Sequence, residues 1–451
     1  MDSFFSMPKY ETYRNSNIQW VGEIPTKWGL EKAKWLFFKA ERKPLVDDEI
    51  VTCFRDGQVT LRKNRRIEGF TNALKEHGYQ RICKGDLVIH AMDAFAGAIG
   101  VSDSDGKSTP VYAACIPRKK GVVNSYYYAY YIRDLALSGF IESLAKGIRE
   151  RSTDFRFNDF ADLLLPLPSY EEQTLIARFL DKKTAQIDNV ITIKEQEINL
   201  LKERKQIIIQ KAVTQGLDPN VQLKNSGVDW IGKIPAHWVV VKLKTLIAAL
   251  ESGVSVNASE SEAANDGEVG VLKTSAVYKY CFDATQNKKV FPVETKRVSC
   301  PVKAGSIIIS RMNAPDLVGA SGYVEEDKPN LFLPDRLWQA RFKSENKNVA
   351  KFISKSLITK GFRGVIESVA TGSSPSMKNI SKGDLLNIYV ALPPETEFEL
   401  IIKTLEKQEK SINEAISIQV QLIEKLKEYK TTLINSAVTG KIKITPEMAE
   451  Q

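Results

Sequence analysis

The chain contains the same two blocks of sequence twice, in the same order. Residues 15–28 (NSNIQWVGEIPTKW) return as residues 225–238 (NSGVDWIGKIPAHW), an offset of 210 positions. A second block, which starts with Leu-Pro and closes with Ala-Val-Thr, spans residues 167–214 and returns as residues 392–439, an offset of 225 positions. Solenoid proteins repeat every 20 to 50 residues or so, and a period this much longer indicates duplicated domains. A duplicated protein most simply recognises a two-part target.

Composition limits the class of protein. A length of 451 residues with 43% hydrophobic side chains allows two to four domains with real cores. The net charge of +9 suits a polyanionic partner such as nucleic acid, although many other proteins share it. No signal peptide and no apolar run long enough for a membrane span is visible, so we expect a cytoplasmic protein. The five cysteines form no metal-binding or disulfide pattern and are expected to be reduced core thiols.

Between the repeated blocks the sequence changes character. Short β-rich runs such as residues 87–89 and 307–309 alternate with turn residues and a few helical stretches. This mixture predicts a compact α+β domain in each half. Residues 85–92 also resemble residues 305–312, at an offset of 220, which predicts one fold with different surface residues.

Each of these domains is followed by a long polar helix. Residues 171–214 contain no proline or glycine, and apolar residues recur at three- and four-residue steps, Val190 and Ala212 included. About 44 helical residues make a rod of roughly 65 Å. The second copy has the same heptad frame, which favours an antiparallel coiled coil between the two helices within one chain, with a domain at each end. A homo-oligomeric coiled coil is the alternative. The predicted pairing residues are Ile187, Ile191, Ile198, Leu201 and Ile208 in the first helix, and Ile412, Ile416, Ile423, Leu426 and Leu433 in the second.

The sequence therefore predicts an α+β fold with approximate two-fold symmetry inside one chain. Two similar domains, at residues 1–168 and 218–392, each precede a spacer helix, at residues 169–217 and 393–441. A short tail, residues 442–451, closes the chain.

The doubled markers resemble those of the specificity subunit of type I restriction-modification enzymes. The marker N-S-x-x-x-W-x-G-x-I-P-x-x-W precedes each variable domain, and L-P followed by a long helix and A-V-T comes after each. The resemblance covers the chain from about position 13 to position 442. The second copy departs at residues 397–398, where Glu-Phe replaces the usual Glu-Gln near the helix start.

This resemblance implies a non-catalytic subunit. Each domain would be a target-recognition domain that reads one half of a split sequence in double-stranded DNA, with the helices setting the spacing. Two methyltransferase subunits would dock on the helices, and restriction-translocase subunits would join them. S-adenosylmethionine, ATP and Mg²⁺ would be held by those partners, and no cofactor or metal by this chain.

Candidate DNA contacts follow from side-chain chemistry. Arginine and lysine pair with guanine, and asparagine and glutamine pair with adenine, whereas phosphates need only cations and small donors. A solvated loop, or turns before a strand, would explain the same residues. We expect Met92 and Met312, beside two of the candidates, in the core. In the first domain the candidates are Arg55 and Gln58 for bases, Arg62, Lys63, Arg65 and Arg66 for phosphates, and His90, Arg149 and Arg151; in the second they are Arg311, Asn313, Ser373 and Lys378.

Motifs for enzymes fail on spacing. Residues 100–108 resemble a phosphate-binding loop, but five residues separate its glycines where the motif needs four. The same segment has valine where a calcium-binding loop begins with aspartate. A methyltransferase or nuclease active in the isolated chain is thus a weaker hypothesis. The remaining alternative is a coiled-coil interaction protein whose two domains bind other proteins.

Overall fold

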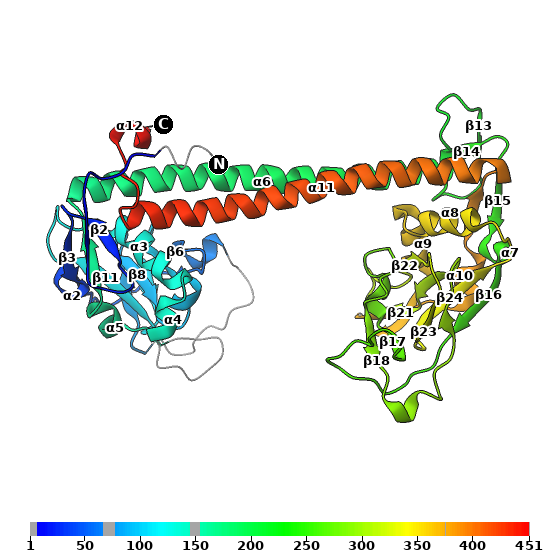
Figure 1. Cartoon of the computed structure of the whole chain (residues 1–451), viewed down its shortest axis with the longest axis horizontal. Coiled ribbons are helices and arrows are strands. Elements are labelled where there is room, and N and C mark those ends of the chain that lie inside the picture. Colours follow the sequence, from blue (N-terminus) through cyan, green and yellow to red (C-terminus); the bar gives the residue numbers. More distant parts are fainter. Residues whose placement is uncertain (1–6, 66–76, 145–153, 375, 451) are drawn as a thin grey trace. The chain divides into compact units, whose positions relative to one another are not determined.

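The computed structural model describes residues 7–65, 77–144, 154–374 and 376–450. The chain forms two compact units, drawn with all their elements in Figure 1. Unit 1 comprises Met1–Glu195 and Val420–Gln451, and unit 2 comprises Gln196–Gln419. The two long helices, α6 (Tyr170–Gln215) and α11 (Glu395–Val438), each contribute one part to unit 1 and the other part to unit 2.

Unit 1 is built on a four-stranded antiparallel sheet in the order β4-β11-β8-β9. Small two-stranded pairs flank it: β1 with β2, β3 with β12, β5 with β6, and β7 with β10. The strands are β1 (Tyr13–Asn15), β2 (Glu23–Pro25), β3 (Gly29–Lys32), β4 (Phe37–Lys39), β5 (Val51–Cys53), β6 (Val59–Leu61), β7 (Gln80–Ile82), β8 (Leu87–His90), β9 (Ile99–Val101), β10 (Gly106–Ser108), β11 (Tyr112–Pro117) and β12 (Leu164–Leu167). The helical elements are α2 (Ala33–Leu36), η1 (Arg62–Asn64), η2 (Ala94–Ala96), α3 (Ser125–Leu137), α4 (Phe140–Leu144), α5 (Phe157–Ala161) and α12 (Pro446–Glu450).

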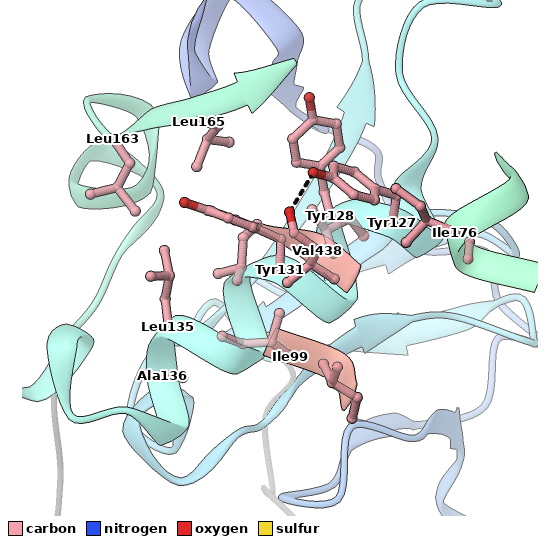
Figure 2. Close-up of a cluster of buried hydrophobic side chains, with 14 of the residues drawn as sticks. Ile99, Tyr127, Tyr128, Tyr131, Leu135, Ala136, Leu163, Leu165, Ile176 and Val438 are labelled. Atoms are coloured by element: carbon pink, nitrogen blue, oxygen red, sulfur yellow. Dashed lines mark hydrogen bonds between the residues drawn. The ribbon is translucent and has the colours of Figure 1, made fainter. Parts of the chain in front are cut away.

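The core of unit 1 centres on the tyrosine-rich helix α3. The Asn124 side chain caps this helix by accepting from the backbone N–H groups of Tyr126 and Tyr127, which satisfies donors that the first turn leaves open. Figure 2 shows Tyr127, Tyr128 and Tyr131 packed among apolar side chains of the sheet, of α6 and of the end of α11. The Tyr127 hydroxyl donates to the Val438 carbonyl oxygen at 2.8 Å. The last turn of α11 is therefore part of this core.

Unit 2 repeats the same central sheet. Its order is β16-β24-β20-β22, again antiparallel, so the predicted similarity of the two domains is confirmed. Two further sheets, β18-β17-β23-β19 and β21-β26-β25, have no counterpart of the same size in the described part of unit 1. The strands are β13 (Leu223–Asn225), β14 (Lys233–Pro235), β15 (Val239–Lys242), β16 (Ile247–Ser252), β17 (Gly270–Leu272), β18 (Asn287–Lys289), β19 (Pro301–Val302), β20 (Ile307–Ser310), β21 (Met312–Asn313), β22 (Ser321–Tyr323), β23 (Lys328–Phe332), β24 (Leu337–Phe342), β25 (Thr371–Ser374), β26 (Met377–Asn379) and β27 (Tyr389–Leu392). The helical elements are α7 (Leu243–Leu246), η3 (Thr274–Val277), η4 (Pro292–Glu294), α8 (Lys347–Leu357), α9 (Lys360–Val369) and α10 (Lys382–Asn387).

The long helices pair antiparallel, as predicted. In unit 1 the Lys430 ammonium contacts the Asp188 carboxylate at 2.7 Å. In unit 2 the Lys205 ammonium donates to the Asn413 side-chain oxygen at 3.0 Å. Position 188 corresponds to 413 and position 205 to 430 at the offset of 225, so one contact occurs twice with the repeats exchanged. The fold-class prediction, two α+β domains with two paired helices, is therefore confirmed.

The pairing residues lie on the covered side of the helices. Next to the predicted Ile208, the neighbouring Ile209 is the fully buried residue, because its side chain joins the core of unit 2. Val190, which shares the predicted frame, is exposed. Ile187, Ile198, Ile423 and Leu433 are buried, and Ile191, Leu201, Ile208, Ile412, Ile416 and Leu426 are half-buried.

The repeated marker makes the same contacts in both copies. In each copy a strand that ends on the first residue of the marker pairs with a strand inside it, β1 with β2 and β13 with β14. The last residue of the marker is a buried tryptophan that hydrogen-bonds a glutamate in the first turn of the following long helix. The Trp28 indole N–H donates to Glu172 at 3.1 Å, and the Trp238 indole N–H donates to Glu397 at 3.0 Å.

The Glu-Phe variant in the second copy leaves the start of α11 intact. Gln173 in unit 1 is buried and bonds the backbone at Val122, Asn124 and Pro168. At the equivalent position Phe398 instead packs edge-on against Phe352, with ring centroids 5.2 Å apart. An apolar contact replaces a set of polar ones.

Each long helix ends against a marker. Gly440, with a φ of +75°, follows α11, and a Cβ there would lie 2.6 Å from Pro25 and 3.0 Å from Trp28. Gly216, with a φ of +72°, follows α6 and faces Trp238. The end of α6 thus packs on the second marker, and the end of α11 packs on the first.

Two expectations from composition can be compared with the structure. Cys53 and Cys115 are buried free thiols, as expected, and burial raises the pKa of both. Cys281, however, is exposed, because it lies in a turn outside the strands, so the prediction of core thiols was wrong there. Among the described residues, no helix combines the length and apolar character needed to cross a bilayer.

We expect Leu433→Ala to destabilise unit 1 strongly. Leu433 is fully buried on α11, and removing its side chain leaves a cavity that costs about 2–5 kcal/mol. Leu422→Ala is the matched control, because Leu422 lies on the same helix and is 41% exposed. Its expected cost is within about 0.5 kcal/mol. Urea unfolding followed by circular dichroism measures both, and equal losses would contradict the proposed seam.

We expect Gly440→Ala to cost more than Gly22→Ala. Both glycines of unit 1 have a left-handed φ, which costs an alanine about 1–2 kcal/mol. Only Gly440 also faces a close neighbour, whereas a Cβ on Gly22 would meet nothing within 4 Å. The difference in melting temperature between the two variants therefore isolates the contact of the helix end with the marker. Identical melting temperatures would show that the contact of Gly440 with the marker leaves room for a Cβ.

Candidate nucleic-acid interface

In unit 1 a tight turn between β5 and β6 presents Arg55 and Gln58. The turn is closed by the Gly57 N–H, which donates to the Phe54 carbonyl oxygen at 2.9 Å, and Gly57 has a φ of +90°. Asp56 accepts from the Gln58 N–H at 3.1 Å, which orders the far side of the turn. Both predicted base readers are exposed. The local sequence Arg-Asp-Gly-Gln is therefore shaped to project two polar side chains.

The basic stretch after β6 forms the 3-10 turn η1. Its cations already have partners: Lys63 pairs with Glu49 at 2.5 Å, and Arg65 pairs with Asp56 at 2.6 Å. The Arg65 guanidinium also stacks over the Phe54 ring, 4.4 Å from its centroid, and Arg62 contacts Thr52 at 3.4 Å. Such exposed ion pairs contribute about 0–1 kcal/mol each to stability, so DNA phosphates could replace the carboxylates as partners of these cations. The predicted phosphate contacts stay a prediction, and Arg66 lies outside the described residues.

The structure joins two candidates that the sequence treated separately. Arg55 donates to the Asp93 carboxylate at 2.7 Å, and the Asp93 N–H lies 3.1 Å from His90 Nδ1. Burial lowers the pKa of His90 despite the neighbouring Asp93, so the ring is neutral at pH 7 and Nδ1 accepts. The imidazole is only 16% exposed and packs on Tyr112. His90 thus orders the backbone at Asp93, the partner of Arg55, and its predicted contact with DNA stays a prediction.

In unit 2 a three-stranded sheet collects the predicted residues. Asn313 on β21 pairs in register with Lys378 on β26, and Ser373 lies on the adjoining strand β25, although its side chain is outside the described residues. The Arg311 guanidinium lies over the Trp338 ring, 5.7 Å from its centroid. Two segments, residues 312–313 and the hairpin of residues 371–379, are separated by about 60 residues of sequence and meet in this sheet, which no local pattern could show.

Sequence reasoning missed the residues that hold Asn313. Its side-chain amide donates to the Tyr278 hydroxyl at 2.9 Å, and Tyr278 in turn lies 2.7 Å from the Thr274 hydroxyl. These residues come from η3 and its end, and their Thr-x-x-x-Tyr spacing on one helical turn was the only signal in the sequence. The neighbouring expectation for the methionines was partly wrong. Met92 is 47% exposed because it follows the end of β8, and Met312 is half-buried.

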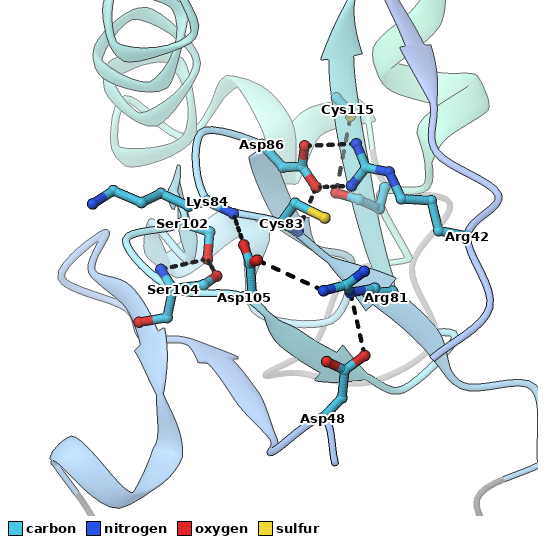
Figure 3. Close-up of polar contacts among 11 residues, drawn as sticks. Arg42, Asp48, Arg81, Cys83, Lys84, Asp86, Ser102, Ser104, Asp105 and Cys115 are labelled. Carbon is cyan, nitrogen blue, oxygen red and sulfur yellow. Dashed lines mark hydrogen bonds and ion pairs between the residues drawn. The ribbon is translucent and has the colours of Figure 1, made fainter. Parts of the chain in front are cut away.

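Other arginines of unit 1 are structural. Figure 3 shows Arg42 binding the buried Asp86 through two nitrogens, at 2.5 and 3.1 Å, and Arg81 between Asp48 and Asp105. The hydrogen bond that Arg42 donates to Asp86 raises the pKa of Arg42, and Asp86 also accepts from the Cys83 N–H. These pairs fix the chain before β8. The candidates Arg149 and Arg151 lie outside the described residues.

No protein-family model matches the chain. The type I restriction enzyme MjaVIII specificity subunit of Methanocaldococcus jannaschii is 27% identical over 332 residues, 73% of this chain and 73% of that protein. The putative MjaX specificity subunit of the same organism is 25% identical over 97% of this chain and 98% of its own length.

A solved structure from a study of complex assembly in a type I restriction-modification system has the same fold. It superposes with a TM-score of 0.68 at 15% identity and covers 92% of this chain and 98% of its own. The fold, the doubled markers and the two relatives agree. The chain belongs to the type I restriction-modification specificity subunits.

Proposed function

We propose that this specificity subunit reads a split sequence in double-stranded DNA, one half-site per unit, with α6 and α11 setting the spacing. The observation that carries the proposal is the repetition of one sheet with different polar residues at the same place. β8 ends at His90 and is followed by Asp93, the partner of Arg55, whereas the equivalent β20 ends at Ser310 and is followed by Arg311 and Asn313. A constant frame with variable readers is what recognition of two unlike half-sites requires.

The chemistry of these residues fits base readout. An arginine such as Arg55 or Arg311 can donate two hydrogen bonds to guanine, and the amides of Gln58 and Asn313 can pair with adenine. Arg55 bonds Asp93, and the Asn313 amide donates to both Tyr278 and Ser310. These partners hold each side chain in place, and Asn313 would exchange one of them for the base that it reads. The cations of η1 would add contacts to phosphates that carry no sequence information.

We further propose that the chain is non-catalytic and acts with partner subunits. Two methyltransferase subunits would dock on the long helices, and restriction-translocase subunits would complete the enzyme. S-adenosylmethionine, ATP and Mg²⁺ would be bound by those partners. In unit 2, large apolar side chains on the outer faces of the helices support a docking role, because Leu200, Ile207 and Ile418 are 64%, 60% and 56% exposed. The complex would act in the cytoplasm.

We expect Asn313→Ala to alter only one half of the methylated sequence. Removing a paired amide costs about 1–3 kcal/mol of discrimination at a single base. Lys63→Ala should instead weaken binding to all sequences and reduce the slope of affinity against salt by about one. Sequencing of methylated bases and titration at several salt concentrations measure these effects. The proposal fails if the wild-type complex methylates no split sequence, or if Asn313→Ala changes both halves.

We expect a matched deletion in both helices to shorten the spacer alone. Residues 189–195 and 423–429 lie opposite each other within unit 1, in the register that the contact of Lys430 with Asp188 sets, and removing one heptad from each keeps the frame. At 1.5 Å per residue the helices lose roughly 10 Å, which is about three base pairs. Deleting residues 189–195 alone is the control, and it should abolish activity by breaking the pairing of the two helices. Unchanged spacing with altered half-sites would contradict this division of roles.

A further inference from the structure

In unit 1 one arginine ties together the two turns that carry the candidate readers. Arg133 lies on α3, and its Nε donates to the Gly97 carbonyl oxygen at 3.2 Å while its Nη2 donates to the Arg55 carbonyl oxygen at 3.3 Å. The first carbonyl belongs to the turn that begins at Asp93, and the second belongs to the turn that carries Arg55 and Gln58. A single rigid guanidinium therefore sets the separation of the two turns.

These turns pack so closely that their backbones leave no room for side chains. A Cβ on Gly100 would lie 1.9 Å from the Gly57 carbonyl oxygen, and one on Gly57 would lie 2.9 Å from Arg133. A Cβ on Gly97 would lie 2.9 Å from the Arg55 carbonyl oxygen. Small shifts of the guanidinium must therefore move the backbone from which Arg55 projects.

Arg133 is also connected to the long helix α6. It lines a cavity of about 200 Å³ together with Asp56, Tyr130 and Asp181, and burial lowers its pKa. Tyr130, on the same helix α3, donates to the Asp181 carboxylate of α6 at 2.8 Å. Arg133 therefore shares one cavity with a residue of α6 and with the turn that carries Arg55.

Unit 2 has a related arrangement, built from a different helix, in which the arginine bonds the backbone of one turn and not of two. Arg363 lies on α9, and its Nη2 donates to the Asp316 carbonyl oxygen at 3.1 Å, in the turn that follows Asn313. A Cβ on Gly319 would lie 2.9 Å from Arg363 Nη1, and one on Gly322 would lie 2.3 Å from the Phe282 nitrogen. The guanidinium also lies over the Tyr280 ring, 5.7 Å from its centroid.

The two arginines are not copies of one ancestral residue. The capping residues Asn124 and Asn346 align α3 with α8 at an offset of 222, and this offset places Lys355 opposite Arg133. Lys355 pairs with Glu409 of α11 at 2.5 Å and bonds no reader turn. In each unit an arginine thus bonds the backbone of a reader turn, but the arginine comes from a different helix. This indicates that the turn needs such a bond and that the arginine was not retained from the duplication.

We infer that Arg133 and Arg363 are positioning residues for DNA recognition, each setting the fidelity of the half-site read by its own unit. The inference rests on the proposed function. Neither guanidinium needs to touch a base. Each guanidinium holds the backbone of its reader turn in one position. The reader side chain then meets the base edge without first losing conformational freedom. A mobile turn would let the reader adapt to a wrong base, and discrimination would fall.

The test uses the complete complex of this chain with its methyltransferase partner. Affinity is measured for the cognate duplex and for duplexes with one mismatch in either half-site. We expect Arg133→Met to reduce the mismatch penalty about tenfold in one half-site and to leave the other half-site and the salt slope unchanged. Arg363→Met is the matched control and should do the reverse. Arg133→Lys, which keeps one donor, should fall between wild type and Arg133→Met, and it serves if the methionine variant does not fold.

The outcomes separate the two proposals. If the wild-type complex shows no mismatch penalty in either half-site, the proposed function fails and this inference fails with it. If the wild type discriminates but Arg133→Met changes both penalties alike, or neither, only the positioning role is overturned. A purely structural role would lower the melting temperature and the affinity for all duplexes while preserving the ratio between cognate and mismatched ones.

Discussion

The antiparallel pairing of α6 and α11 is the interaction on which the rest of the structure depends. It does more than join two helices, because each helix completes the core of the unit that belongs to the other repeat. Leu433, Ala437 and Val438 of α11 are buried in unit 1, and Ile209, Ala212 and Val213 of α6 are buried in unit 2. Neither unit has a full core without the distant part of the chain.

The repeated contacts show what the duplication has kept. The tryptophan that ends each marker bonds the glutamate that begins each long helix, and each helix ends in a left-handed glycine against a marker. These contacts fix the entry and exit of the helices at both places. Residues at the ends of β8 and β20 are free to differ, because the sheet beneath them is held by Gly100 and Gly322, where only glycine fits.

The candidate reader side chains of the two units are held by different supporting residues. In unit 1 the neutral His90 and Asp93 orient Arg55, and in unit 2 Tyr278 and Thr274 orient Asn313. The supports differ as much as the readers do, since each must match the length and charge of the side chain that it holds. Arg133 and Arg363, in contrast, act on backbone carbonyls, so they can serve whatever side chain the turn carries.

The sequence by itself determined the duplication, the α+β domains, the paired helices and the family. It could do so because the markers and the heptads are patterns of residues that lie close together in the sequence. It also singled out two candidate reader segments, residues 55–58 and 311–313, and their contacts with DNA stay a prediction. Only the tertiary structure decided which side chains meet. Lys63 pairs with Glu49, Arg55 pairs with Asp93, and Asn313 lies beside Lys378 across a sheet. Such partners come from distant segments that packing brings together, and no spacing along the chain encodes them.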